Sequence, residues 1–330
     1  MKVKTIIAAP IKFSVGVWAL SSCTDRFCTH GYRDSISTIQ AIQLAGKIKG
    51  MEAMVLSAPG VVGRGNCAEV KKALKDSNLK VSSVDSEVSG AEFKNGAFTS
   101  SDPAIRRRAV EVAKCAADMA RELGSPNMGI WPGQDGFDYP FQAEYEDLWK
   151  WTVESVREVG EYARDLHVCV EYKPKEPRKF ITVADVGKVL LLCSEVGLEN
   201  VGATLDFGHA LMAKENPSES ACLLARRGRL FSVHMNDAYR DDDDDMTAGS
   251  VNFWETLELL WWLDRLGYEG YFAFDIFPAR EDLVRICELN IRNMQTIGAL
   301  ARKLNTEELH ALLHRQDVLS AHELLRSSLF

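Results

Sequence analysis

The sequence predicts a single (β/α)8 barrel of the α/β class, extended by helices at its carboxyl end. Eight short apolar segments alternate with longer segments of helical periodicity. Glycine follows several helical segments, as at Gly124, Gly197 and Gly267, where it would cap a helix end. The first apolar segment is followed by no glycine-rich phosphate-binding fingerprint, which argues against an open dinucleotide-binding sheet.

Each expected strand is short and rich in Val, Ile, Leu or Phe, which is typical of strands buried on both faces. These strands are Phe13–Trp18, Ala53–Ser57, Lys80–Ser86, Asn127–Trp131, Val168–Tyr172, Val201–Asp206, Leu230–His234 and Tyr271–Phe277. The longest expected helix opens at Ser101-Asp-Pro103, a start signal with proline in the first turn. The expected helices are Asp102–Leu123, Tyr145–Leu166, Val183–Val196, Ser218–Arg227 and Phe253–Leu266.

The length of 330 residues suits one large core, because barrels of this class often exceed about 250 residues. We expect a barrel domain over residues 1–304 and a helical extension over residues 305–330. Leucines of the extension, such as Leu309 and Leu319, have no barrel strand to cover. They would pack on the outside of the barrel or on a neighbouring subunit, and a homodimer or homotetramer is expected.

Composition excludes several classes of protein. The net charge is −8 and the basic residues form no stripe, which argues against a nucleic-acid partner. The eight cysteines form no CxxC pair, and several lie in apolar segments. Reduced core thiols and a cytoplasmic location follow. No apolar segment reaches the roughly 18 residues of a membrane span, so no membrane partner is expected.

Polar residues close four consecutive late strands. They are Glu171, Asp206 with His209 three residues later, His234, and Asp275. Each alone could cap a helix or be a satisfied core residue, but active sites of barrels form where the strands end. Carboxylates that converge there repel one another and are costly to desolvate, unless a cation joins them. Oxygen-rich ligands with one or two imidazoles suit Mg²⁺, Mn²⁺ or Co²⁺.

A run of five aspartates, Asp241 to Asp245, follows the seventh strand. Most charge runs are solvated surface segments. This one follows the strand that ends in the candidate ligand His234, at the expected mouth of the barrel. We therefore expect it to contribute to a second metal site.

Three motifs resemble those of the xylose isomerase-like superfamily, and the resemblance extends over most of the barrel. Glu171-Tyr-Lys-Pro-Lys-Glu-Pro-Arg178 resembles the strand-five motif of xylose isomerases. Leu205-Asp-Phe-Gly-His-Ala210 resembles the strand-six motif of L-rhamnose isomerase and the ketose 3-epimerases. Asp243-Asp-Asp-Met-Thr-Ala-Gly-Ser250 resembles the acidic loop of L-rhamnose isomerase, the closest type. The resemblance implies an aldose–ketose isomerase that moves hydride between C1 and C2 of an open-chain monosaccharide.

The resemblance also implies roles for individual residues. The structural metal would be held by Glu171, Asp206, His234 and Asp275. The second, catalytic metal would be joined by His209, Asp243 and Asp245, with Asp242 and Asp244 as the alternative register. Mn²⁺ is the expected ion, with Mg²⁺ or Co²⁺ as alternatives, and two ions per subunit are expected.

The remaining implied roles concern the substrate. Lys173 would neutralise charge on the substrate carbonyl oxygen, and Asp243 or Asp245 would shuttle the hydroxyl proton. Trp131 resembles the aromatic wall of the sugar site, and Trp18 is expected to line the same site. The ring-opening histidine of the family isomerases is absent from Leu56-Ser-Ala-Pro-Gly60. His30, in the loop after the first strand, is the candidate substitute, and the sugar itself is not predicted.

A metal-dependent ketose 3-epimerase is the main alternative, with Glu171 as the base that abstracts a proton. The epimerases carry Glu at strand eight and lack the acidic loop, so Asp275 and the aspartate run favour the isomerase. A metal hydrolase would need more histidine ligands and a basic groove. A sugar-binding protein without catalysis is disfavoured by the complete ligand set.

Overall fold

The computed structural model describes residues 10–304 and 306–329. Residues 1–9 of the predicted barrel domain, and residues 305 and 330 of the predicted extension, lie outside the described residues. Within the described ranges, none of the helices combines the length and the apolarity that a membrane crossing requires.

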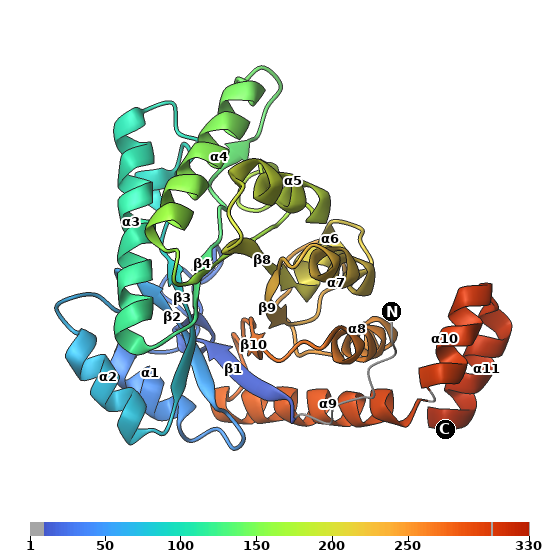
Figure 1. The fold of residues 1–330 in the computed structure, drawn as a ribbon. Coiled ribbons are helices and arrows are strands. Elements are labelled where there is room, and N and C mark those ends of the chain that lie inside the picture. Colours follow the sequence, from blue (N-terminus) through green and yellow to red (C-terminus); the bar gives the residue numbers. More distant parts are fainter. Residues whose placement is uncertain (1–9, 305, 330) are drawn as a thin grey trace.

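Parallel strands form a closed barrel in the order β1-β10-β9-β8-β6-β4-β3-β2 (Figure 1). They are β1 (Lys12–Gly16), β2 (Ala53–Ala58), β3 (Lys80–Ser86), β4 (Asn127–Ile130), β6 (His167–Glu171), β8 (Val201–Asp206), β9 (Leu230–Met235) and β10 (Tyr271–Phe274). The predicted (β/α)8 fold is thus confirmed, with each strand at its predicted place. A small antiparallel sheet, β5 (Gly136–Phe137) with β7 (Phe180–Ile181), was not predicted.

Helices surround the barrel, and two short 3-10 helices, η1 (Val17–Leu20) and η2 (Ala91–Phe93), follow β1 and β3. The α-helices of the barrel are α1 (Thr38–Ala45), α2 (Cys67–Asp76), α3 (Pro103–Leu123), α4 (Tyr145–Tyr162), α5 (Val186–Val196), α6 (Phe207–Met212), α7 (Pro217–Arg226), α8 (Phe253–Leu266) and α9 (Leu283–Lys303). The start of α3 shows why the local signals were readable. Asp102 accepts a hydrogen bond from the Ala104 amide, Pro103 occupies the first turn, and Gly124 ends the helix in a left-handed conformation.

Two strands stop two or more residues before their predicted ends. β1 stops at Gly16, and Trp18 belongs to η1. The indole of Trp18 folds back over Gly16, where an added Cβ would lie 2.3 Å from the ring, so the turn requires glycine. β10 stops at Phe274, and the Phe277 amide then donates to the Asp245 carbonyl at 3.0 Å. The chain therefore leaves the barrel early to bind the acidic loop.

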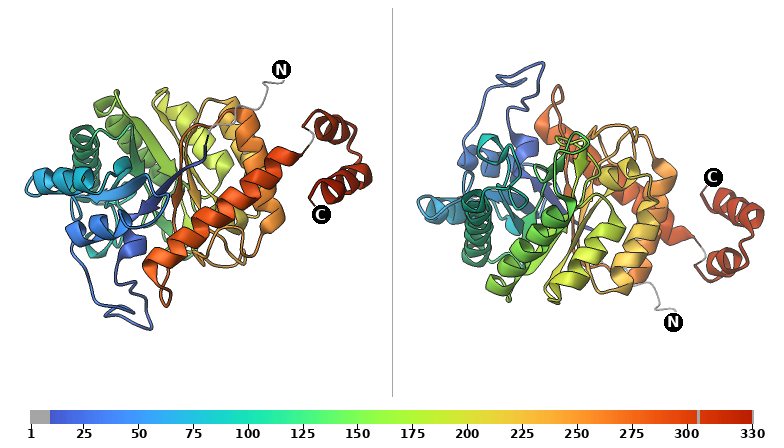
Figure 2. Two further views of the ribbon diagram at one scale, coloured as in Figure 1. Left: turned by 90° about the horizontal axis from the view of Figure 1, so that it is seen from below. Right: turned by 90° about the horizontal axis from the view of Figure 1, so that it is seen from above.

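The helical extension consists of α10 (Thr306–Arg315) and α11 (Val318–Leu329). Figures 1 and 2 show this pair beyond the end of α9, set off from the barrel. An apolar groove of about 590 Å³, with Trp254 and Leu312 among its lining residues, lies between the pair and α8. Val318 and Leu319 are exposed by 61% and 75%. Packing on a neighbouring subunit stays a prediction.

Candidate metal and sugar site

Four polar side chains meet at the carboxyl end of the barrel, and we call them the first cluster. Glu171 ends β6, Asp206 ends β8, His234 lies in β9 and Asp275 follows β10. These strands are neighbours in the closed sheet, so their ends face the same space. One ligand atom from each side chain lies within 4.8 Å of those of the others. The structure thus brings together residues that the sequence distributes over about a hundred positions.

His234 shows how well the first cluster fits a cation. Its Nδ1 atom lies 3.3 Å from Glu171 Oε2 and 3.3 Å from Asp275 Oδ2. This nitrogen is buried and has no aligned hydrogen-bond partner. Burial lowers the pKa of His234, but the charges of Glu171 and Asp275 outweigh it and raise the pKa well above its usual value. A divalent ion would replace that proton and satisfy both carboxylates, so the donor set fits a metal.

A second cluster, which we define as His209, Asp243 and Asp245, adjoins the first. His209 lies in α6, whose first turn is capped by Asp206 through the His209 amide at 2.8 Å. The imidazole spans the two clusters, with Nδ1 3.2 Å from Glu171 Oε1 and Nε2 3.2 Å from Asp243 Oδ2. Both clusters therefore share one polar region.

The aspartate run forms a loop whose base is closed by two backbone hydrogen bonds between Asp237 and Met246, of 3.0 and 2.9 Å. Within the loop, Asp243 faces His209 and Asp245 faces Asn236, at 3.2 Å in each case. Asp242 turns outward to Lys175, and Asp244 accepts from the Tyr239 amide. Asp241 is exposed. The inward pair is Asp243 and Asp245 rather than the alternative register.

Lys173 lies directly beside the second cluster. Its Nζ atom is 2.6 Å from Asp243 Oδ2, 3.2 Å from Glu176 Oε2 and 5.4 Å from the centre of the Trp131 ring. Burial lowers the pKa of Lys173, but the Asp243 carboxylate raises it by a larger amount, so the net shift is upward. The amine therefore stays protonated and can stabilise negative charge in the site.

The pKa values of Asp206 and Asp243 are shifted in opposite directions. Burial, with the nearby charge of Glu171 and Asp275, raises the pKa of Asp206 to about 7, although His209 opposes the shift. For Asp243, burial is outweighed by His209 and Lys173, and the pKa falls below its usual range. Divergent pKa values among neighbouring acids are typical of catalytic sites.

Two tryptophan side chains contact residues of the site. Trp18 Nε1 donates to Asp275 Oδ1 at 2.5 Å, and its ring centre lies 6.5 Å from that of His234. Trp131 follows β4, and its ring faces the Lys173 amine. His30 lies exposed in the loop between η1 and α1, outside these contacts. Its role in substrate binding stays a prediction.

The family model of the xylose isomerase-like TIM barrel matches residues 41–296. The chain belongs to this family. A xylose isomerase of Thermus thermophilus is 32% identical over 219 residues, which are 64% of this chain and 57% of that protein. The chain therefore spans little more than half the length of that relative.

Solved structures of the family share the fold at low sequence identity. A D-tagatose 3-epimerase-like protein superimposes with a TM-score of 0.68 at 20% identity, covering 88% of this chain and 99% of that one. L-ribulose 3-epimerase gives 0.67 at 15% identity, over 89% and 96% of the two chains. These likenesses show the barrel fold and do not identify the reaction.

Three site residues of this xylose isomerase-like barrel were not predicted. Asp85, in β3, is the first; its pKa is raised to about 6 by burial, and it lies within electrostatic range of His234 and Glu171. Asn236, at the end of β9, bonds Asp206 and Asp245. Arg178 is the third. A strand-end position was the available signal for the first two, but an amide or a lone acid there is common.

Arg178 links the loops that carry Trp131 and Lys173. Its guanidinium donates to the Lys94 carbonyl at 2.7 Å, the Gln134 carbonyl at 3.1 Å and the Asp138 carboxylate at 2.7 Å. These loops follow β3 and β4, whereas Arg178 itself follows β6. With the β5–β7 sheet, this contact fixes the loop of Trp131 against that of Lys173.

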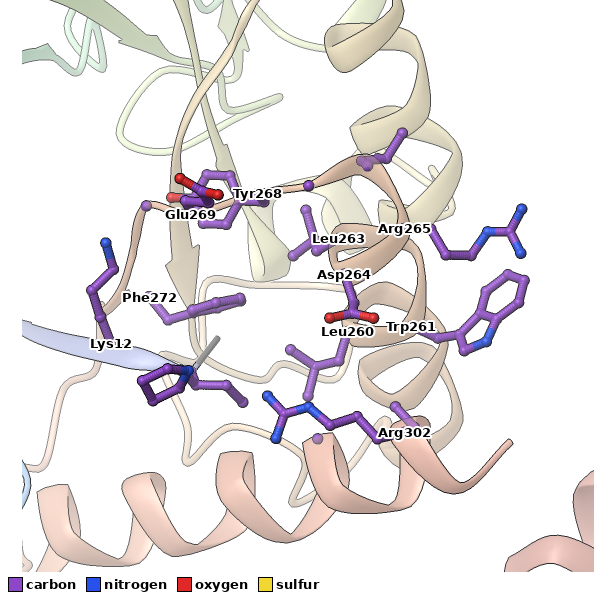
Figure 3. A pocket seen from close by; sticks show the side chains of 17 residues that line it. Lys12, Leu260, Trp261, Leu263, Asp264, Arg265, Tyr268, Glu269, Phe272 and Arg302 are labelled. Carbon is purple, nitrogen blue, oxygen red and sulfur yellow. The ribbon is translucent and has the colours of Figure 1, made fainter. Parts of the chain in front are cut away.

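A different cavity, of about 450 Å³, lies at the opposite end of the barrel (Figure 3). Its lining includes Lys12 at the start of β1, Tyr268 and Glu269 before β10, and Asp264 of α8. No residue of either cluster lines it. Active sites of (β/α)8 barrels lie at the carboxyl ends of the strands, where the two clusters lie and this cavity does not.

Proposed function

We propose that this protein is a divalent-metal-dependent sugar isomerase that interconverts an aldose and a ketose. The observation that carries the proposal is the first cluster, together with the protonated Lys173 nearby. Lys173 pairs with Asp243, Asp243 contacts His209, and His209 contacts Glu171 of the first cluster. The named xylose isomerase relative, at 32% identity, supports the same reaction class. Mn²⁺ is the ion we favour, with two per subunit, because the ligands combine carboxylates with imidazoles.

Glu171, Asp206, His234 and Asp275 would hold one ion, and His209, Asp243 and Asp245 would join at the other. Bound metal would supply Lewis-acid polarisation of adjacent sugar oxygens, which favours hydride transfer between C1 and C2. The Lys173 amine would stabilise charge that develops on the carbonyl oxygen. Trp18 and Trp131 would flank the sugar and exclude water from it.

Asp243 would handle the hydroxyl proton of the sugar. Its Oδ2 atom is held by Lys173 at 2.6 Å and by His209 at 3.2 Å. Its Oδ1 atom is buried without a hydrogen-bond partner. One oxygen is therefore fixed, while the other is free to accept a hydrogen bond from a hydroxyl or a water molecule and to orient it for proton transfer.

The metal-dependent ketose 3-epimerase is the second candidate, because the similar solved structures include a D-tagatose 3-epimerase-like protein and L-ribulose 3-epimerase. In that reaction Glu171 would abstract the proton at C3. The metal bond and the two histidines that contact Glu171 compete with this role, since burial is outweighed and its pKa is lowered.

The test is a panel of aldoses and ketoses incubated with Mn²⁺, Mg²⁺ or Co²⁺ in deuterated water, followed by NMR of the products. Hydride transfer interconverts aldose and ketose with little solvent deuterium at C1 or C2. Epimerisation by proton abstraction yields ketoses alone, with deuterium at C3. Ketose products labelled at C3 would refute the isomerase and support the epimerase. The absence of turnover with any ion would refute both proposals.

A further inference from the structure

Asn236 links the two clusters through a single buried side chain. It follows β9 and is completely buried. Its Nδ2 atom donates to Asp206 Oδ2 at 3.1 Å and to Asp245 Oδ1 at 3.2 Å. The amide thus contacts one proposed ligand of each ion position while offering no negative charge of its own.

The backbone determines which way this amide faces. The Gly208 amide donates to Asn236 Oδ1 at 2.8 Å, and a backbone N–H can only donate. The oxygen must therefore face Gly208, and the amino group must face the two carboxylates. Because an amino group only donates, it supports the ionised form of both acids, the form in which they bind a metal.

We propose that Asn236 is a positioning residue that sets the spacing between the two ion positions by tying Asp245 to Asp206. The proposal rests on the two-ion site of the proposed function. Within the part of the chain that the structure describes, Asn236 is the one hydrogen-bond donor to the Asp245 carboxylate. The Asp245 backbone is held separately, because its carbonyl accepts a hydrogen bond from the Phe277 amide at 3.0 Å, so Asn236 acts on the side chain alone.

Asp206 depends less on Asn236. Its carboxylate also accepts from the His209 amide at 2.8 Å and lies within the first cluster. Loss of Asn236 should therefore weaken the second ion far more than the first. Partners that orient metal ligands typically change metal affinity by about 10- to 100-fold when removed.

The experiment is a calorimetric titration of the full chain with MnCl₂, together with electron paramagnetic resonance to detect coupling between two Mn²⁺ ions. Asn236→Ala should bind the first ion as the wild type does and the second about 10- to 100-fold more weakly. The coupled signal should then appear only at higher Mn²⁺ concentration. A role limited to folding would not separate the two binding steps.

Two further variants sharpen the result. Gly208→Ala would place a Cβ 2.9 Å from Asn236 Oδ1, so it displaces the amide without removing it. It should weaken the second step in the same direction, by less, and it serves if Asn236→Ala fails to fold. Asn290→Ala is the matched control, because Asn290 is also fully buried and bonds the Ala248 amide and the Ile286 carbonyl. It should bind both ions as the wild type does.

The outcomes separate this role from the proposed function. Two ions in the wild type and an unchanged second step in Asn236→Ala would refute the role of Asn236 alone. Equal weakening of both steps in the Asn236 and Asn290 variants would also refute it, as a general effect of buried amides. A wild type that binds fewer than two ions would refute the two-ion site and this role with it.

Discussion

The two halves of the barrel present different chemistry at the ends of their strands. β6, β8, β9 and β10 bring the first cluster together, and the loop after β9 adds Asp243 and Asp245. β1 and β4 lead instead to the indoles of Trp18 and Trp131, and β3 contributes the acid Asp85. Under the proposed function, the later strands would carry the reaction and the earlier ones would shape the space for the sugar. Substitutions in the two halves should therefore differ in kind.

The largest effect is expected from His234→Ala, because it removes a proposed metal ligand from the first cluster. Turnover should fall below detection with every ion. The wild type should gain about 2.7 kcal/mol of stability when free Mn²⁺ is 100 times its Kd, and the variant should gain little. Thermal unfolding with Mn²⁺ and with chelator measures the gain. An active variant that shows the same metal-induced rise in Tm would contradict the assignment of His234 as a ligand.

The next largest effect should come from Lys173→Met, which keeps the stem of the side chain and removes its charge. We expect kcat to fall by about 100-fold or more, since removing a hydrogen-bond donor that faces developing charge typically lowers kcat by that factor. Lys175→Met is the matched control, because Lys175 is half-buried and pairs with Asp242 outside the clusters. Steady-state kinetics that show equal losses in both variants would argue against a direct role of Lys173.

Much of the fold was predictable because its signals are local. Apolar segments gave the eight strands, and capping residues such as Asp102 and Gly124 gave helix ends. The β5–β7 sheet was missed, since it pairs two-residue segments that lie more than forty positions apart and carry no periodicity. Trp18 was predicted in a strand but lies in η1. The contact of its ring with Gly16 depends on tertiary packing, which the apolar pattern does not show.

The candidate site was predictable to the extent that charge stands at strand ends. Glu171, Asp206, His234 and Asp275 were expected together because parallel strands finish on the same side of the barrel. The aspartate run left two registers open, since the loop geometry decides which side chains turn inward. Asn236 and Arg178 act through contacts with residues distant in sequence, and a neutral amide or a single arginine carries no such signal.

In the first half of the barrel, Asp85→Asn should change stability in a pH-dependent way. Burial raises the pKa of Asp85 to about 6, so the folded chain favours its protonated form. Stability due to this group is present at about pH 4 and lost as pH rises through about 6. The variant keeps the acceptor for Ser83 Oγ and avoids the charged form. In chelator it should therefore be more stable than the wild type at pH 7, by at most about 3 kcal/mol.

The difference in Tm between Asp85→Asn and the wild type should shrink as pH falls from about 7 to about 4. Measuring the difference cancels the titration of the other acids, which both proteins share. A difference that does not change with pH would show that Asp85 is ionised in the folded protein without cost. The first half of the barrel would then hold an ionised acid, as the second half does.

The smallest effect should come from Trp18→Phe, which keeps an aromatic wall but removes the indole N–H that donates to Asp275. A hydrogen bond to a charged group contributes about 1.5 to 3 kcal/mol, and its partial exposure should place this one at the lower end. We expect a KM raised several-fold with kcat changed less, because Asp275 keeps His234 as a neighbour at 3.3 Å. Trp254→Phe, on the exposed face of α8, is the control and should change neither constant. If Trp18→Phe lowered kcat as strongly as Lys173→Met, the indole would act in the reaction itself, and the division between the two halves would fail.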